Sequence, residues 1–356
     1  MAVTIRDVAA LAGVSPSTVS RTCRSSSSIS LKTQEKVRQA MAQLGYEPPG
    51  AAGTQTESSL RTVGIILPSS DRASFENPFF LEVLRGITQL CNEKKVLTAL
   101  VTGKDDRELL ESVQTHTKNR LVNAWILLFS QEGDPVAEYL YSEGIDYVQI
   151  GQPSSHPNET VAVDNDNIAA GQEAAKYLCG LGHRVIAFIG DAPRHRFSTA
   201  RLAGVRLQLQ ELGLDLPADC TAQVDMDDPE VLDKIRRALF PETGPRPTAA
   251  VAADEMHAVL IRQVCHQNGL HIPEDLSLIS FNNSIVSTIA SPALTSIDIN
   301  ARQLGMEAAL QAIKHLENPD LMASRTLVPF QLIERESCSP LKPQNTAVDE
   351  EPEQEE

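Results

Sequence analysis

The sequence is poor in the patterns that announce a metal, a disulfide framework or a membrane segment. Its six cysteines, at positions 23, 91, 179, 220, 265 and 338, form no Cys-x-x-Cys pair, which argues against zinc and disulfide frameworks. The eight histidines show no metal-ligand spacing, so we expect no metal. No apolar run approaches membrane-spanning length, and no basic-then-apolar leader is present. We therefore expect a soluble, cytoplasmic protein with reduced thiols and no membrane partner.

Motifs of common enzyme classes are also missing. No predicted strand is followed by Gly-x-Gly-x-x-Gly, and no Gly-x-Ser-x-Gly elbow occurs. The acidic run Asp225–Asp228 is a better helix cap than a cation site, because Pro229 follows it and suits a helix start. Residues 164–167 resemble the beginning of a calcium loop, but the glycine and the final glutamate of such a loop are missing. We expect neither enzymatic activity nor a cofactor.

Charge is distributed unevenly along the 356 residues. The whole chain carries a net charge of -16, yet residues 1–49 hold six basic and three acidic residues, a net of +3 that leaves -19 for the rest. A basic head on an acidic body is typical of a protein that binds nucleic acid with the head alone.

Residues 4–21 predict two short helices joined by a tight turn. Thr4 is a favourable N-cap for the first helix. Gly13 ends that helix, since glycine adopts positive φ without strain. Ser15 caps the second helix, and Pro16 suits its first position, where no backbone N–H is needed.

The two faces of this helix pair differ in character. Val8, Leu11 and Val19 are predicted to point inward. Ser17 and Arg21, four residues apart, share the outward face of the second helix. Small polar groups and an arginine on a short, pinned helix are typical of a major-groove reader. An ordinary helical hairpin is the alternative that this pattern leaves open.

A third helix and a linker follow. Ser30 is predicted to cap the third helix, whose apolar residues recur at helical spacing, namely Val37, Ala40, Met41 and Leu44. Gly45 ends it. Residues 46–60 contain small residues, prolines and glycines with little apolar bulk, so they form no core element of their own.

The residues Val8-Ala9, Ala12-Gly13-Val14-Ser15 and Thr18-Val19-Ser20-Arg21 resemble the DNA-binding headpiece of LacI/GalR-type bacterial transcription regulators. The resemblance implies a homodimer on double-stranded, pseudo-palindromic operator DNA. Ser17 and Arg21 are the candidates for base edges, and Ser30, with Lys32 and Lys36, for phosphates. The full set of candidate DNA-binding residues is Thr4, Ser15, Pro16, Ser17, Thr18, Ser20, Arg21, Arg24, Ser30 and Ala51.

The linker departs from the resembling family. In that family this segment forms a hinge helix, from which a leucine of each subunit wedges into the minor groove. Here the wedge position falls on Ala51 and an expected arginine falls on Gly53. Pro49 and the glycines oppose a helix. We therefore expect a weak kink of the DNA, or none.

From Arg61 onward, apolar runs alternate with amphipathic helical stretches, which predicts parallel sheets covered by helices. The expected fold class is α/β, with an N-terminal helix-turn-helix headpiece and, as the resemblance to the family implies, a two-lobed, periplasmic-binding-protein-like body with parallel sheets. The expected domains are a headpiece (1–46), a hinge (47–60), an effector-binding and dimerisation domain (61–337) and a disordered acidic tail (338–356). Lobe one is expected at about 61–163 and 295–323, and lobe two at about 164–293 and 324–337.

Residues at strand ends are the candidates for a ligand cleft, because ligands bind there in open α/β sheets. Aromatic faces and polar forks suit a sugar, although the phenylalanines are equally explained by core packing. Arg201 matches the family position that forks onto the ligand, and pairing with an acid is its alternative role. The candidates are Ser69, Asp71, Phe79, Phe80, Phe197, Arg201, Asp254 and Asn282.

Three further stretches are similar to the Gram-positive maltose-operon regulators of this family, namely residues 163–167, 279–283 and 294–299. The resemblance implies a repressor of a sugar-utilisation operon, released from DNA by maltose or a maltodextrin. No leucine heptad occurs in the tail, so a dimer is expected. The alternatives are a global carbon-catabolite regulator that uses a phosphorylated carrier protein as corepressor, and a sugar-binding module that does not act on DNA.

Overall fold

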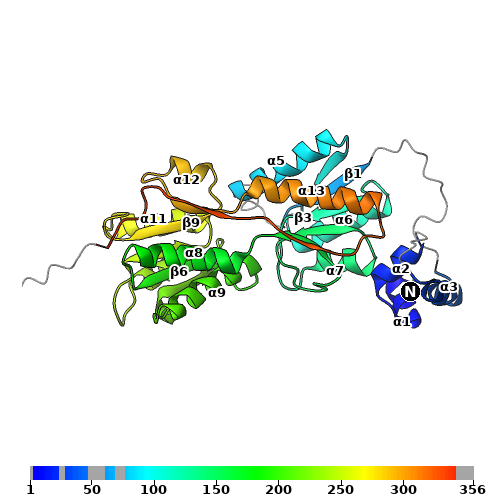
Figure 1. The fold of residues 1–356 in the computed structure, drawn as a ribbon, viewed down its shortest axis with the longest axis horizontal. Coiled ribbons are helices and arrows are strands. Elements are labelled where there is room, and N and C mark those ends of the chain that lie inside the picture. The colour runs from blue at the N-terminus through cyan, green and yellow to red at the C-terminus, as the bar shows by residue number, and fades with distance from the viewer. Residues whose placement is uncertain (1–2, 24–28, 47–60, 69–76, 342–356) are drawn as a thin grey trace, which may run out of the picture.

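The computed structural model describes residues 3–23, 29–46, 61–68 and 77–341. The expectations for Arg24, Ala51, Ser69 and Asp71, for the hinge and for the tail beyond residue 341 lie outside these ranges. Figure 1 shows the described parts in a row, with the headpiece at one end, lobe one beside it and lobe two at the other end. No helix in the described ranges is long and apolar enough to span a membrane.

Three helices build the headpiece, as predicted: α1 (Ile5–Ala12), α2 (Pro16–Cys23) and α3 (Leu31–Leu44). Gly13 and Gly45 end α1 and α3 with φ of 68° and 67°, the left-handed conformation in which glycine has no steric cost. A small core of Ile5, Val8, Ala9, Val19, Val37 and Ala40 holds the helices together. The prediction for Leu11 was wrong, because its side chain faces solvent and is 47% exposed.

Lobe one is the first six-stranded sheet with its helices. The strand order is β11-β5-β4-β3-β1-β2, and the paired strands run parallel. Its strands are β1 (Thr62–Ile66), β2 (Leu97–Val101), β3 (Ala124–Leu127), β4 (Tyr147–Ile150), β5 (Val161–Asp164) and β11 (Arg325–Leu327). Its helices are α5 (Pro78–Glu93), α6 (Asp106–Lys118), α7 (Pro135–Ser142) and α13 (Ala301–Glu317).

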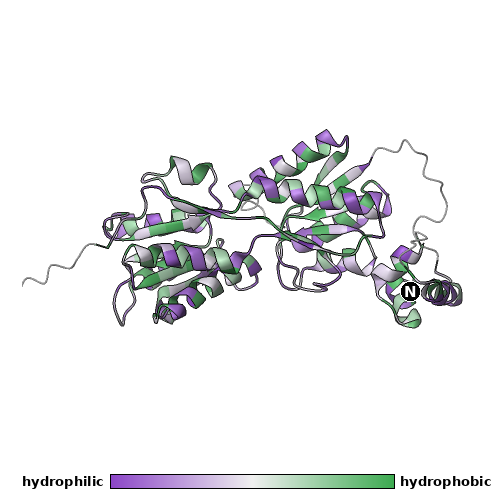
Figure 2. Ribbon diagram, viewed as in Figure 1, coloured by the Kyte–Doolittle hydropathy of each residue, from purple (hydrophilic) through white to green (hydrophobic). Residues whose placement is uncertain are grey.

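Lobe two is built in the same way, with strand order β12-β10-β9-β8-β6-β7 and only β12 antiparallel to its neighbour. Its strands are β6 (Ile186–Asp191), β7 (Thr221–Val224), β8 (Ala249–Ala252), β9 (Ser277–Phe281), β10 (Thr295–Asp298) and β12 (Gln331–Ile333). Its helices are α8 (Asn167–Gly180), α9 (Arg196–Glu211), α10 (Val231–Leu239), α11 (Glu255–Gln267), α12 (Ile285–Ile289) and the 3₁₀ turn η1 (Ala218–Cys220). The strands of both sheets are largely hydrophobic (Figure 2), as expected where helices cover parallel strands.

The fold class is confirmed, but the exchange of chain between the lobes differs from the prediction. Residues 295–298, expected in lobe one, form β10 of lobe two, and residues 325–327, expected in lobe two, form β11 of lobe one. β11 and β12 follow each other closely in the chain but are separate strands, interrupted at Pro329, which has no N–H to donate to a ladder. The short strands β5, β7 and β10 were not predicted as separate strands.

The segments that cross between the lobes are tied together by the buried amide of Asn165. Its Nδ2 donates to the carbonyl oxygens of Ile299, at 3.0 Å, and Val328, at 2.8 Å. Asn300 adds a bond from its Nδ2 to the carbonyl of Pro329, at 2.8 Å. The link from β5 to α8 is thereby joined to the links from β10 to α13 and from β11 to β12, and any movement of one lobe against the other must pass through this bundle.

Candidate nucleic-acid interface and effector cleft

The predicted DNA-reading residues lie at the start and along one face of α2. Ser15 Oγ accepts from Thr18 N at 3.3 Å, so Ser15 caps the helix that Pro16 begins. Thr4 and Ser30 stand at the starts of α1 and α3, and Ser30 Oγ accepts from the N–H of the third helical residue. Three helix N-termini with hydroxyl caps therefore lie in one small unit, an arrangement that suits phosphate oxygens.

The outward face of α2 rests on lobe one in this structure. Ser17 Oγ donates to Glu159 Oε2 at 3.1 Å, and Ser20 Oγ donates to the carbonyl of Gly144 at 2.9 Å. Arg21 donates to the carbonyl of Leu321 at 3.2 Å. The face predicted to read base edges is therefore half-buried against the body, and DNA can reach it only after these contacts open.

Arg6 of α1 supports the same docking. Its guanidinium forms an ion pair with Glu138 of α7. All four contacts involve exposed or half-exposed side chains, and such contacts contribute little net free energy each. The headpiece is thus held against lobe one by weak polar contacts that DNA phosphates can replace.

Arg201 occupies the interior of lobe two, with 2% of the residue exposed. Its Nε donates to Asn167 Oδ1 at 2.9 Å, and its Nη1 donates to the carbonyl of Ala253. The guanidinium carbon lies 4.2 Å from the ring centroid of Phe281 and 5.0 Å from that of Phe197. Burial lowers the pKa of Arg201 to about 10, although nearby carboxylates oppose this. The group is therefore a cation fixed in one orientation between two aromatic rings.

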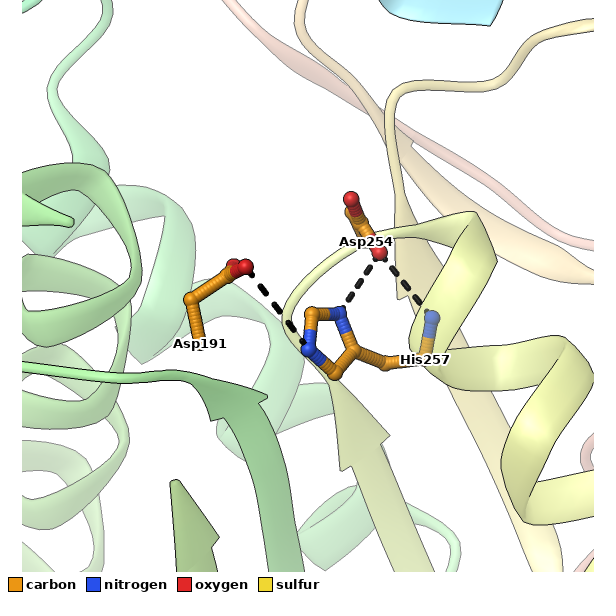
Figure 3. A group of neighbouring side chains, drawn as sticks. All are labelled: Asp191, Asp254 and His257. Atoms are coloured by element: carbon orange, nitrogen blue, oxygen red, sulfur yellow. Dashed lines mark hydrogen bonds and ion pairs between the residues drawn. The ribbon is translucent and has the colours of Figure 1, made fainter. Parts of the chain in front are cut away.

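Asp254 begins α11 and connects several groups. One carboxylate oxygen accepts from the backbone N–H of His257 at 3.0 Å and pairs with its Nδ1 at 2.7 Å (Figure 3). The other oxygen accepts from Asn77 Nδ2 of lobe one at 3.3 Å. Asp254 thus lies at the contact between the lobes, as a strand-end residue of an open α/β sheet should.

The buried imidazole of His257 also faces Asp191, the last residue of β6. The distance from His257 Nε2 to Asp191 Oδ1 is 3.9 Å. Burial alone would lower the pKa of His257, but the carboxylates of Asp254 and Asp191 outweigh it and raise that pKa to about 9. Burial raises the pKa of Asp191. These groups form a charged cluster on the wall of lobe two.

The remaining described candidates are placed around this cluster. Asn282 follows β9, is 8% exposed and has φ of 92°, a left-handed conformation that asparagine tolerates better than most residues. Phe79 and Phe80 pack edge to face, with centroids 5.2 Å apart, and both contact the large core. Core packing therefore accounts for much of what these two rings do.

Further contacts connect the two lobes. Gln131 of lobe one and His195 of lobe two form an isolated antiparallel bridge, and Glu132 N donates to the carbonyl of Arg194 at 3.3 Å. With the bond from Asn77 to Asp254, these contacts hold the lobes against each other at the cleft.

A pocket at this boundary is lined from both lobes, by Gln152 of lobe one and by Asp164, Asn167, Arg196 and Phe197, among others. Burial raises the pKa of Asp164 to about 6, despite a hydrogen bond from the backbone N–H of the next residue. Arg196 Nε is buried with no hydrogen-bond partner among the described residues. The pocket therefore joins an aromatic face to polar groups of both signs, which suits a polyhydroxylated ligand.

The sequence analysis predicted Arg201, Phe197 and Asp254 as residues of the ligand cleft, but it did not predict Asp191 or His257. Asp191 is the last residue of β6, and its carboxylate faces the imidazole of His257. Histidine spacing alone gave no signal for His257. The detectable signal was an aspartate N-cap followed by a histidine three residues later, which places both side chains on one helix turn.

A helix-turn-helix headpiece joined to a two-lobed α/β body with a polar cleft defines a DNA-binding transcriptional regulator. Comparison with known proteins agrees. A profile described as "Bacterial regulatory proteins, lacI family" matches residues 4–49, and one described as "Periplasmic binding protein-like domain" matches residues 175–338.

The HTH-type transcriptional regulator MalR of Staphylococcus xylosus is 32% identical over 346 residues, which is 96% of this chain and 99% of the relative. A solved putative transcriptional regulator LacI from Bacillus cereus subsp. cytotoxis matches with a TM-score of 0.75 and 34% identity, over 80% of this chain and 100% of that one. A CelR–cellobiose complex matches with a TM-score of 0.74 and 27% identity, over 94% and 99%. The chain belongs to the LacI family of bacterial transcriptional regulators.

Proposed function

We propose that this chain is a dimeric repressor of a sugar-utilisation operon and that maltose or a maltodextrin releases it from its operator. The observation that most supports this proposal is the position of Asp254 at the start of a helix of lobe two. Its carboxylate interacts electrostatically with Arg201 and accepts a hydrogen bond from Asn77 of lobe one. A ligand that engages these groups changes how the lobes meet, and that is the coupling an inducer needs.

On the DNA side, Ser17 and Arg21 meet base edges, and Ser30, Lys32 and Lys36 meet phosphates. Thr4, Ser15, Pro16, Thr18 and Ser20 orient α2 or contact the backbone. The basic charge of the headpiece supports this role. In this proposal two headpieces of a homodimer read two half-sites of a pseudo-palindrome.

On the ligand side, a neutral sugar uses Arg201, Asp254 and Asn282 as hydrogen-bond partners and Phe79, Phe80 and Phe197 as apolar faces. A solved structure described as a probable maltose operon transcriptional repressor, 28% identical to this chain with a TM-score of 0.71, supports a maltose-type effector. The regulator in the CelR complex holds cellobiose, another glucose disaccharide, which supports a disaccharide-sized cleft. The choice between these disaccharides is what the experiment has to decide.

The test is DNA binding measured by fluorescence anisotropy, with the DNA upstream of the gene and with maltose, maltotriose, cellobiose and ribose added in turn. Maltose or maltotriose is expected to weaken binding at least tenfold, while ribose has no effect. Operator affinity that no sugar changes, or that rises only when a phosphorylated carrier protein is added, would contradict the proposal.

Arg21→Ala separates base reading from general attraction to DNA. Loss of a bidentate arginine–guanine contact is expected to cost about 1–3 kcal/mol at one base pair of the operator. Equal weakening on operator and on unrelated DNA would show that Arg21 only contacts phosphate.

A further inference from the structure

We infer that Asp191, Asp254 and His257 form a binding site for a divalent transition metal ion of the zinc class on the wall of lobe two. Nε2 of His257 and the carboxylate of Asp191 are the metal ligands, and Asp254 is a positioning residue for the imidazole. The inference concerns metal binding by this chain and does not depend on which sugar, if any, enters the cleft.

The first support is that two buried atoms of this cluster lack hydrogen-bond partners among the described residues. His257 is fully buried, and its Nε2 has no hydrogen-bond partner among the described residues. The same holds for Asp191 Oδ2. Buried polar atoms without hydrogen bonds are costly. The ion pair between His257 Nε2 and Asp191 Oδ1 leaves Nε2 and Asp191 Oδ2 without a hydrogen bond, and a metal ion would satisfy both groups.

The second support is distance. Nε2 of His257 lies 3.9 Å from Asp191 Oδ1, which is too far for a hydrogen bond. Zinc lies about 2.0–2.1 Å from an imidazole nitrogen and about 2.0–2.2 Å from a carboxylate oxygen, so one ion bridges these two atoms once the Asp191 side chain moves slightly closer, as tetrahedral coordination requires. One ligand atom from each of Asp191, Asp254 and His257 falls within 4.8 Å of the others.

The third support is the orientation of the ring. The carboxylate of Asp254 accepts a hydrogen bond from Nδ1 of His257 at 2.7 Å, and this bond directs Nε2 of the ring toward Asp191 (Figure 3). A carboxylate on the far nitrogen of a metal-binding histidine fixes the tautomer and makes the ligating nitrogen more basic. Because Asp254 occupies the Nδ1 side of the ring, it positions the ligand and does not share the ion at Nε2.

The donor set selects the class of ion. One imidazole nitrogen and one carboxylate suit zinc, cobalt or nickel better than calcium or magnesium, which prefer oxygen alone. The Asp191 side chain is 17% exposed, so the positions left open on the ion are reachable by water or by hydroxyl groups. The site thus has the open coordination of a metal that meets a ligand, unlike a closed structural zinc.

The experiment is calorimetric titration of chelator-treated, full-length protein with zinc chloride, and with cobalt chloride followed by visible absorption. The parent is expected to bind one ion at this site, and the cobalt spectrum is expected to show nitrogen and oxygen ligands without thiolate bands. The thiolate readout is needed because the chain has six free cysteines, which also bind zinc.

Three variants test the assigned roles. His257→Gln and Asp191→Asn remove a ligand each and are expected to weaken zinc binding more than tenfold. Asp254→Asn retains a good N-cap and is expected to weaken zinc binding about 10–100-fold, as loss of an outer partner does. Where His257→Gln fails to fold, Asp191→Asn decides the question, because it preserves shape.

His271→Gln is the matched control. Its Nδ1 also pairs with an aspartate on the same turn, at 3.3 Å, but the side chain is 79% exposed. Zinc affinity should be unchanged in this variant. The inference is overturned if the parent binds no zinc, if the cobalt spectrum shows thiolate ligands only, or if His271→Gln weakens binding as much as His257→Gln does.

Discussion

The two lobes share a scaffold but not a chemistry. Each has a six-stranded sheet and a pair of helices that cross closely at two glycines, Gly86 and Gly305 in lobe one, Gly171 and Gly204 in lobe two. The buried cluster of Arg201, Asp254 and His257 lies in lobe two. Lobe one offers the cleft the neutral groups of Asn77 and Gln131, together with the carboxyl of Asp164 at the end of β5. Two lobes of the same architecture therefore differ in role: lobe two holds the buried charged cluster, and lobe one contacts the headpiece.

The largest expected effect tests whether lobe two depends on its buried cation. Arg201→Met should lower the free energy of unfolding by about 3–5 kcal/mol, because it leaves buried acids and the Asn167 amide oxygen without their partner. Denaturant unfolding measures it. Arg85→Met on lobe one is the control, since Arg85 pairs with Glu82 at the surface and should change stability by at most about 0.5 kcal/mol. Similar losses in both variants would contradict the contrast between the lobes.

The next effect tests the shared scaffold. A Cβ added at Gly204 would lie 2.0 Å from the carbonyl oxygen of Ile168, and one at Gly86 would lie 2.0 Å from that of Arg302. Gly204→Ala and Gly86→Ala should each cost about 1–3 kcal/mol, because the helices must separate.

Gly180→Ala is the control for these two variants. Gly180 is also helical, but an added Cβ meets no atom within 4 Å. Alanine there should stabilise the protein by about 0.4–1 kcal/mol, since it restricts the unfolded chain. Thermal unfolding measures the stability of the three variants. A large loss of stability for only one of Gly204→Ala and Gly86→Ala would show that the helix crossings of the two lobes are not equivalent.

The third prediction concerns Asp164, which ends β5 where the chain passes from lobe one to lobe two. Burial raises its pKa to about 6, so the native state binds a proton more tightly than the unfolded state does. This contribution to stability is present below about pH 4 and is lost as the pH rises through about 6. It amounts to roughly 2 kcal/mol over that range.

Asp164→Asn should remove that part of the pH dependence, measured as the free energy of unfolding at pH 4–7. Asparagine retains an oxygen to accept from Asn165 N and Asn167 Nδ2. Asp166→Asn is the control, because Asp166 is an exposed N-cap that asparagine replaces well. An unchanged slope in Asp164→Asn would place the titrating group elsewhere.

The comparison also shows what a sequence can predict. The headpiece was predicted nearly residue by residue, because caps, glycine stops and helical period all act over a few positions. Leu11 was the exception, because it lies on the face of α1 that is turned to solvent. In the body, long helices and buried strands were predicted well. The exchange of β10 and β11 between sheets was not, because three- and four-residue strands carry no usable period.

The site divides in the same way. Arg201 was predicted from the resemblance to the family, and Asp254 from its place at the end of a predicted strand. Asp191 and His257 come from different strands and helices, and their approach depends on how β6 and β8 pair in the sheet. No local pattern encodes such a pairing. The hydrogen bond from Ser17 to Glu159, 142 residues further along the chain, could not be predicted from the sequence either.

The smallest expected effect is on operator affinity, and it tests whether lobe one, which contacts the headpiece, influences DNA binding more than lobe two does. Glu159→Gln removes the charged acceptor of Ser17 Oγ on lobe one and should tighten operator binding by at most about 1 kcal/mol, roughly fivefold, because exposed polar contacts contribute little each. Anisotropy at fixed salt measures the change, since salt alone alters DNA affinity.

Glu211→Gln, on an exposed position of α9 in lobe two, changes the net charge equally and should leave affinity almost unchanged. A gain in Glu159→Gln alone would mean that lobe one competes with DNA for the reading face. An equal gain in both would mean that only the overall negative charge of the body matters. Because the contact is weak, it can delay DNA binding without preventing it, and lobe one then regulates access while lobe two responds to the ligand.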